Sequence, residues 1–134
     1  MDEKFYIVYY REQTKFLKKE ELDLVFECNE DLKHYEGSEF DYGVHNRYIF
    51  CISSETKVVG VLIYYFNSEG EIWLSKIYVK PTCRRNKIAT KLFEELSRLN
   101  KTIDLGINPA NQESMQLFSS LGFKPIYIAY RKNV

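Results

Sequence analysis

Apolar residues in the first third of the chain form one strand-like run followed by a longer segment with helical spacing. Residues 4–11 are dense in aromatic and β-branched side chains, which predicts a first strand. Residues 13–32 place an apolar stripe among many Lys and Glu, which predicts one helix, or two short helices broken near residues 19–20, with Thr14 as a candidate cap. Residues 33–47 show no clear period and predict a long loop.

The middle of the chain predicts three consecutive strands. Residues 48–53, 57–66 and 71–79 are apolar runs, and the short polar segments between them have the composition of tight turns. Strands joined in this way form an antiparallel meander.

The last third alternates helix and strand. Residues 86–100 predict a helix, 102–107 a buried strand, 111–121 a second helix ended by Gly122, and 123–130 a last strand. A strand–helix–strand unit requires a parallel pair across its crossover, so the strands before and after the first of these helices should be parallel neighbours. The predicted fold class is therefore α/β (α+β), with a mixed, mostly antiparallel sheet of about six strands.

Composition limits the classes of function. The 134 residues predict a single domain over residues 1–134. Lys+Arg and Asp+Glu both number 19, and this balance argues against a general nucleic-acid binder. The three Cys are far apart with no CxxC spacing, so we expect free thiols and no metal site. We expect no membrane partner and a cytoplasmic location, because no apolar run could span a bilayer and the first residues lack a signal-peptide core.

Positive charge concentrates where a strand leads into a helix, within residues 71–92. Arg84, Arg85 and Lys87 lie in the short loop between the two predicted elements. A helix N-terminus with free N–H groups and nearby cations is suited to bind an anion. The alternative is a plain strand–loop–helix crossover with solvated basic residues, and this stretch alone leaves both readings open.

Two motifs resemble those of the GNAT superfamily of N-acyltransferases. Residues 79–89 read V-K-P-T-C-R-R-N-K-I-A and are similar to the family's cofactor motif V-x-P-x-x-[Q/R]-x-x-G-x-[G/A]. Residues 111–123 read N-Q-E-S-M-Q-L-F-S-S-L-G-F and match the second motif, N-x-x-[A/S]-x-x-[L/F]-[Y/F]-x-x-x-G-F, in full. The resemblance implies the GNAT fold, with a parallel pair of strands that splays apart and helices on both faces of the sheet.

The resemblance also implies acetyl-CoA as co-substrate. The backbone N–H of Ile77 would polarise the thioester carbonyl, residues 84–90 would wrap the pyrophosphate, and Asn111 would bond the pantetheine arm, although Asn111 could also be only a helix cap. The implied cofactor-binding residues are Ile77, Tyr78, Val79, Arg84, Arg85, Asn86, Lys87, Ile88, Ala89, Thr90, Asn111 and Phe118.

Residues 84–90, called the phosphate loop below, depart from the family pattern. Lys87 stands where the motif has its first Gly, and Arg85 where Gly is common. Either these side chains add charge-assisted contacts to phosphate, or they weaken the cofactor site.

The sequence identifies the general acid and the general base of the implied reaction less clearly than the cofactor residues. Phe118 replaces the Tyr that protonates the CoA thiolate in many members, so either water or another phenol (Tyr78, Tyr127 or Tyr130) would supply that proton. We predict Glu71 as the general base, against the simpler reading of an exposed hairpin carboxylate. His34 and His45 are alternative bases, and an acyl-enzyme on Cys83 is a less favoured route.

The predicted function is an N-acetyltransferase that moves acetyl from acetyl-CoA to a primary amine by direct attack in a ternary complex. The alternatives are a catalytically weak or inactive CoA-binding or regulatory module and a small interaction domain. The acceptor is a small-molecule or protein amine, and Glu36, Glu39 and Asp41 favour a cationic one. Only eleven residues follow Phe123, which leaves an open sheet edge and predicts a monomer or a homodimer.

Overall fold

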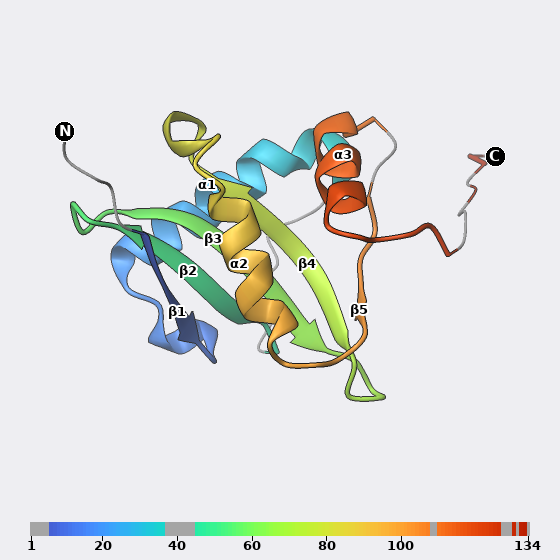
Figure 1. Cartoon of the computed structure of the whole chain (residues 1–134), viewed down its shortest axis with the longest axis horizontal. Coiled ribbons are helices and arrows are strands. Elements are labelled where there is room, and N and C mark those ends of the chain that lie inside the picture. Colours follow the sequence, from blue (N-terminus) through green and yellow to red (C-terminus); the bar gives the residue numbers. More distant parts are fainter. Residues whose placement is uncertain (1–5, 37–44, 108–109, 127–129, 131, 134) are drawn as a thin grey trace.

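The computed structural model describes residues 6–36, 45–107, 110–126, 130 and 132–133, with the backbone alone for residues 32–36. The elements in chain order are β1 (Tyr6–Arg11), the 3-10 turn η1 (Thr14–Phe16), α1 (Lys19–Glu36), β2 (Arg47–Ser53), β3 (Val58–Phe66), β4 (Ile72–Val79), the 3-10 turn η2 (Pro81–Cys83), α2 (Ile88–Ser97), β5 (Ile103–Asp104) and α3 (Gln112–Ser120). Figure 1 shows the strands as one twisted layer with helices on both sides.

The sheet has the order β1-β2-β3-β4-β5, with antiparallel pairs up to β4 and a parallel β4–β5 pair. Side chains of α2 and α3 join one apolar cluster on one face, and those of α1 join a second cluster on the other. Both the meander and the parallel pair across the α2 crossover are confirmed, and so is the mixed α/β fold class.

Differences from the sequence prediction lie before and after the central meander. Five strands are present among the residues that the structure describes, against the six or so predicted. The predicted last strand, 123–130, has no strand structure over 123–126, and 127–129 lie outside the described residues. The predicted buried strand 102–107 shortens to the two residues of β5, both half-buried, because only the first two residues of β4 pair with it.

The predicted helix of residues 13–32 is interrupted, as one of the two alternatives expected, but it does not form two short helices: the three-residue turn η1 is followed by the single 18-residue helix α1. Thr14 does not cap α1; its hydroxyl lies 2.8 Å from the Tyr48 hydroxyl, so it joins η1 to β2. Because α1 continues to residue 36, the predicted loop begins inside the helix, and residues 37–44 lie outside the described residues.

The N-terminal end of α1 is anchored by a buried carboxylate. The Glu21 side chain, 2% exposed, accepts hydrogen bonds from the Lys18 backbone N–H (2.8 Å), the Tyr9 hydroxyl (2.7 Å) and the Arg11 Nε (3.2 Å). Burial disfavours the ionised carboxylate, but these three donors outweigh burial and lower the pKa of Glu21. The link fixes α1 against β1.

A β-bulge interrupts β4 close to its centre. Ile63 of β3 pairs with Lys76, whereas the next residue, Tyr64, pairs with Leu74. Ser75 is therefore an extra residue on β4, and such an insertion kinks a strand and shifts its alternation by one position.

The bulge changes which side chains face which helix. Leu74 lies before it and packs under α2, and so do Ile77 and Val79 after it. Tyr78 packs in the cluster under α1 instead. If the same residues, Ser75 included, formed a regular strand without the bulge, strict alternation would put Tyr78 on the same face as Leu74 and turn Ile77 to the opposite face.

Lys76, the first residue after the bulge, also points toward α1. Its ammonium donates a hydrogen bond to Oδ1 of Asn29, and the two side chains are 6% and 4% exposed. This buried pair ties α1 to β4 directly beside Ile77.

Candidate active site

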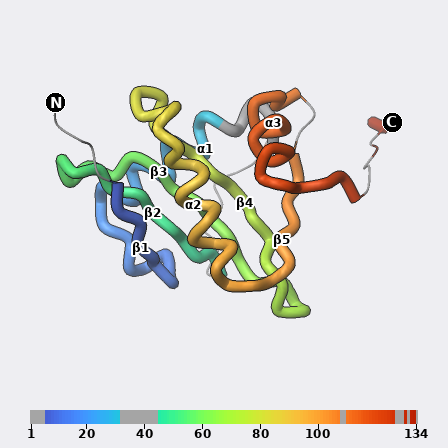
Figure 2. The backbone as a smooth tube through the Cα atoms, viewed as in Figure 1, coloured from blue at the N-terminus to red at the C-terminus, as the bar shows by residue number. Residues whose placement is uncertain are grey.

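The candidate site begins where β4 and β5 separate. The two strands pair only at Ile72–Ile103 and Trp73–Asp104. Beyond this point residues 105–107 run away from β4, as Figure 2 shows, and form no strand. Residues 77–79 therefore have β3 as a neighbour on one side and an open edge on the other.

The hydrogen-bond pattern shows which main-chain groups face that open edge. The Lys80 N–H bonds the Val59 carbonyl of β3 at 2.9 Å, so Lys80 directs its backbone toward β3. Because residues alternate along an antiparallel strand, Tyr78 also directs its backbone toward β3. The N–H and C=O groups of Ile77 and Val79 therefore point to the open side, where the family resemblance requires them.

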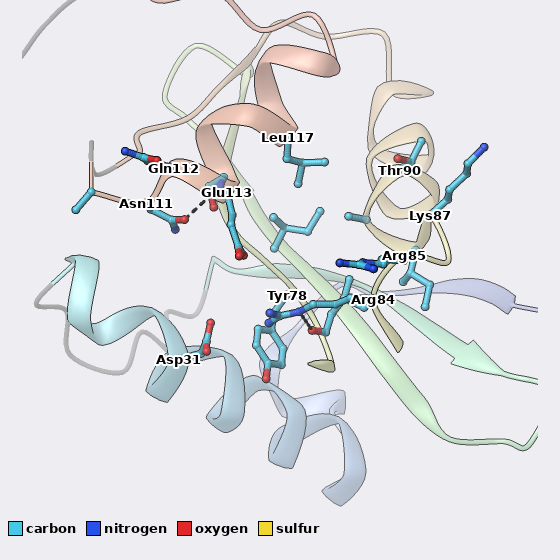
Figure 3. Close-up of a pocket in the computed structure, with 16 residues that line it drawn as sticks. Asp31, Tyr78, Arg84, Arg85, Lys87, Thr90, Asn111, Gln112, Glu113 and Leu117 are labelled. Atoms are coloured by element: carbon cyan, nitrogen blue, oxygen red, sulfur yellow. Dashed lines mark hydrogen bonds between the residues drawn. The ribbon is translucent and has the colours of Figure 1, made fainter. Parts of the chain in front are cut away.

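A cavity of about 790 Å³ occupies the opening. Figure 3 shows that it lies between α3, the end of β4, the N-terminal part of α2 and the side of α1. Its lining residues are Ile77, Tyr78 and Val79 of β4; Arg84, Arg85, Lys87, Ile88, Ala89 and Thr90 of the loop and α2; Ala110, Asn111, Gln112, Glu113, Ser114 and Leu117 of α3 and the residues before it; and Asp31 of α1.

Most of the predicted cofactor residues thus lie together, with two exceptions. Asn86 does not line the cavity; its Nδ2 donates to the Cys83 carbonyl at 3.0 Å and so braces the loop from within. Phe118 is 5% exposed in the core, with its ring 5.4 Å from that of Phe123, and Leu117 faces the cavity in its place.

Glu71, the predicted general base, is not brought to the site. It precedes the first residue of β4, and its carboxylate accepts a 2.6 Å hydrogen bond from the Thr102 N–H. Six residues of extended chain separate it from Ile77, a span of about 20 Å. Glu71 instead ties the chain before β5 to the closed end of the strand pair, so this placement does not support its role as the base. Of the alternatives, His45 is exposed outside the cavity lining, and the His34 side chain lies outside the described residues.

The phosphate loop keeps a glycine-like backbone without glycine. Arg85 and Lys87 both have positive φ, of 70° and 59°, and Lys87 has a ψ of 27° in the left-handed region. A side chain in this region costs about 1–2 kcal/mol, which glycine would avoid. The loop therefore has, at these two positions, positive φ values of the kind that glycine adopts without cost, and it adds two long cationic side chains to the cavity wall.

The α2 N-terminus is open to an anion. Lys87 is its N-cap residue and makes no side-chain capping bond, and the first turn contains no acidic residue. Ile88, Ala89 and Thr90 of this turn line the cavity. Their free N–H groups and the positive end of the helix dipole are suited to bind an anion beside the loop cations.

Arg84 is held at the rim of the cavity by two contacts. Its Nε donates to the Val79 carbonyl at 3.0 Å, and its guanidinium carbon lies 5.7 Å from the centre of the Tyr78 ring. These contacts fix the direction of Arg84.

The side of the cavity that α1 and α3 form is acidic. Asp31 and Glu113 line it, and the Tyr78 hydroxyl hydrogen-bonds Glu27 of α1. Burial, followed by this bond and the Glu27 charge, raises the pKa of Tyr78 to about 12, so the phenol is protonated at neutral pH. Among the three candidate phenols, Tyr78 lies at the cavity, Tyr130 is 90% exposed, and Tyr127 lies outside the described residues.

Both ends of α3 have the caps that the sequence predicts. Asn111 Oδ1 accepts a 3.2 Å hydrogen bond from the Ser114 N–H, which confirms the cap; Asn111 also lines the cavity, and its contact with the pantetheine arm stays a prediction. At the other end Gly122 has a φ of 94°, and the Phe123 N–H bonds the Phe118 carbonyl at 3.0 Å in a Schellman motif. Gly122 therefore serves the fold.

Several lining residues were missed from sequence. Gln112, Glu113 and Leu117 lie inside the second motif, so their helix position was available as a signal. Asp31 had no such signal, because only the packing of α1 against β4 brings it to the cavity. The described residues contain no group of His, Cys, Asp and Glu arranged to hold a metal ion, and none of their helices is both long and apolar enough to cross a bilayer.

These features define an α/β domain with a cavity at a splayed pair of parallel strands, beside a helix N-terminus that is suited to bind an anion. Residues 8–123 match the Acetyltransferase (GNAT) family, and the chain belongs to that family. A comparison with curated protein sequences finds no match.

Solved structures share the fold at low sequence identity. An aminoglycoside N-acetyltransferase AAC(6')-Iy in complex with CoA is 16% identical, with a TM-score of 0.70 over 99% of this chain and 98% of that chain. A ribosomal-protein-alanine N-acetyltransferase from Brucella melitensis biovar Abortus 2308 is 14% identical, with a TM-score of 0.68 over 97% and 100%. An aminoglycoside acetyltransferase from an uncultured soil metagenomic sample is 20% identical, with a TM-score of 0.65 over 97% and 99%.

Proposed function

We propose that this protein is an acetyl-CoA-dependent N-acetyltransferase that transfers acetyl to a primary amine by direct attack in a ternary complex. The observation that carries the proposal is the separation of β4 from β5 beyond Trp73. It leaves the main chain of Ile77 and Val79 facing a cavity that ends at the α2 N-terminus.

The cavity fits the two chemical parts of CoA. The pantetheine arm is an amide chain, and the outward N–H and C=O of Ile77 and the N–H of Val79 can pair with it as an added strand would, while the Val79 carbonyl accepts the bond from Arg84. The pyrophosphate carries negative charge, which Arg85, Lys87 and the first-turn N–H groups of α2 can bind. The fixed guanidinium of Arg84 lies between these two regions.

Transfer of the acetyl group requires stabilisation of the charge that develops on the thioester oxygen. The Ile77 N–H is directed to the open edge and would donate to that oxygen. The departing thiolate has the pKa of an ordinary thiol, about 8.5, so water can protonate it and no phenol is needed at position 118. The Tyr78 hydroxyl is protonated but is directed to Glu27 of α1, away from the thioester.

The acceptor is proposed to be a cationic amine. Asp31 and Glu113 give the wall opposite the loop cations a negative charge, which favours an ammonium group before it is deprotonated. Aminoglycosides and the N-terminus of an alanine peptide, suggested by the names of the structural neighbours, are the first acceptors to assay.

Binding and turnover are tested separately. Calorimetric titration with acetyl-CoA, together with a thermal shift, measures binding. Release of free CoA thiol in the presence of sisomicin, spermidine or an alanine peptide measures transfer. Absence of acetyl-CoA binding by the folded protein would refute the proposal.

A matched pair of variants tests the proposed phosphate site. Lys87→Glu reverses a charge at the cavity and should weaken acetyl-CoA binding at least tenfold, an order-of-magnitude expectation for loss of a charge-assisted contact and gain of repulsion. Lys91→Glu makes the same charge change on α2 outside the cavity lining and should leave the affinity nearly unchanged. Equal effects of the two variants would contradict the placement.

The alternative is a CoA-binding module without turnover. It is favoured by one observation: position 118 carries no phenol and lies in the core. Acetyl-CoA binding without thiol release across the amine panel would select this alternative.

A further inference from the structure

Gly60 of β3 lies directly beneath the start of α2. A Cβ atom built on Gly60 would be 2.9 Å from Ile88 Cγ2 and 3.3 Å from Leu92 Cδ1. The first distance is shorter than real Cβ atoms show. Gly60 is not among the residues with positive φ, so its backbone conformation does not require glycine. What requires glycine at this position is the close approach of α2 to the sheet.

The same residue also supports the other wall of the cavity. Gly60 is the register partner of Val79, whose main chain faces the opening. Gly60 also lies against Ile88, the first residue of α2, which is 2% exposed and lines the cavity. Gly60 is therefore in contact with both the strand that has the open edge and the N-terminal end of α2.

We infer that Gly60 is a positioning residue for the CoA phosphate site: it sets the distance between the open edge of β4 and the N-terminus of α2. This inference rests on the proposed function. A methyl group at position 60 would have to move Ile88 Cγ2 from 2.9 Å to at least 3.4 Å, where ordinary contact begins. N–H donors bind phosphate oxygens only within a narrow range of distance, so a shift of this size at a whole helix turn weakens several bonds together.

The test is Gly60→Ala, measured by calorimetry at a temperature where circular dichroism shows the variant to be fully folded. We expect the Kd for acetyl-CoA to rise about tenfold, as one lost charge-assisted bond would cause. We expect the Kd for S-acetylpantetheine, which lacks the pyrophosphate, to stay unchanged. A merely destabilising substitution would affect both ligands equally or neither, so either of those results would overturn the inference.

Two further variants make the test specific. Gly106→Ala is the control, because its Cβ would meet the Trp73 ring at 3.7 Å, an ordinary contact, and it should bind acetyl-CoA like wild type. Ile88→Ala removes Cγ2, so adding Gly60→Ala to Ile88→Ala should cause no further loss of affinity. A tenfold loss in that background would overturn the inference.

The double variant also answers the case in which Gly60→Ala alone does not fold. Gly60→Ala with Ile88→Ala restores room at the contact and should fold and bind like Ile88→Ala. Failure of the wild-type protein to bind acetyl-CoA would refute the proposed function itself. Normal binding by wild type and by folded Gly60→Ala would refute only the role of Gly60.

Discussion

Replacing Lys87 with glycine should change stability and affinity in opposite directions. Lys87 holds φ at 59° and ψ at 27°, a conformation that glycine adopts without steric cost. Relief of the side-chain penalty contributes about 1–2 kcal/mol, and the greater entropy of glycine in the unfolded chain removes about 0.5–1 kcal/mol of it. The net gain of about 0.5–1 kcal/mol should raise the Tm of the ligand-free protein by about 2–4 °C.

The same substitution removes an ammonium group from the cavity wall. Lys87 is exposed, so its contact with phosphate is screened and contributes only about 1 kcal/mol, or about a fivefold change in Kd. Lys87→Gly should therefore bind acetyl-CoA about fivefold more weakly at low salt. The gap between variant and wild type should narrow as salt is added, because the lost term is electrostatic.

Differential scanning fluorimetry without ligand and calorimetry at two salt concentrations measure both effects. Lys87→Ala is the matched comparison, since it removes the charge but keeps a side chain at positive φ. It should lose affinity like Lys87→Gly and gain no stability. The reasoning is refuted if Lys87→Gly lowers the Tm, or if it binds acetyl-CoA more tightly than wild type.

Three further substitutions test the fold and the site. Glu21→Gln should lower the free energy of unfolding by about 2 kcal/mol at neutral pH. Because folding lowers the pKa of Glu21, the carboxylate stabilises the fold above the unfolded pKa of about 4.3, and this stabilisation is lost as the pH falls further. Urea melts should therefore show a smaller difference between variant and wild type in acid, and a constant difference would argue against an ionised carboxylate. Phe118→Tyr places a hydroxyl in the core and should lower the free energy of unfolding, measured in denaturant melts, by about 1–3 kcal/mol. It should not increase the rate of thiol release, and faster release would show that position 118 reaches the thioester. Gly122→Ala forces a side chain to a φ of 94° and should cost about 1 kcal/mol, which an unchanged Tm would disprove.

The central meander was predictable because its turns are encoded locally. Asn67 Oδ1 accepts hydrogen bonds from the Glu69 and Glu71 N–H groups, and Gly70 supplies a φ of 77°. These residues specify the β3–β4 turn without help from the rest of the chain. The length of β5 was not predictable in this way. Its pairing with β4 ends at Asp104 because the two strands diverge there, and residues 105–107 have no strand to pair with.

The candidate site was predictable where its residues are close in sequence. The motif places Val79 and the loop up to Thr90 together, and the structure brings them to one cavity. The prediction for Glu71 was misleading because Glu71 is only six residues from Ile77 in sequence, whereas an extended strand of that length spans about 20 Å. Phe118 was misplaced because the motif does not state which side of α3 faces the core, and the packing of its ring on Phe123 decides it.

The extra residue at Ser75 makes β4 tolerant of a shorter length at this position. Deleting Ser75 would restore strict alternation and leave the Lys76 and Tyr78 side chains facing α1 and the Ile77 side chain facing α2. Deleting Ile77 instead would turn Tyr78 toward the apolar cluster beneath α2 and Val79 toward α1. Among descendants of this sequence, we therefore expect substitution or loss of residue 75 to be tolerated and single-residue gaps after the bulge to be eliminated by selection.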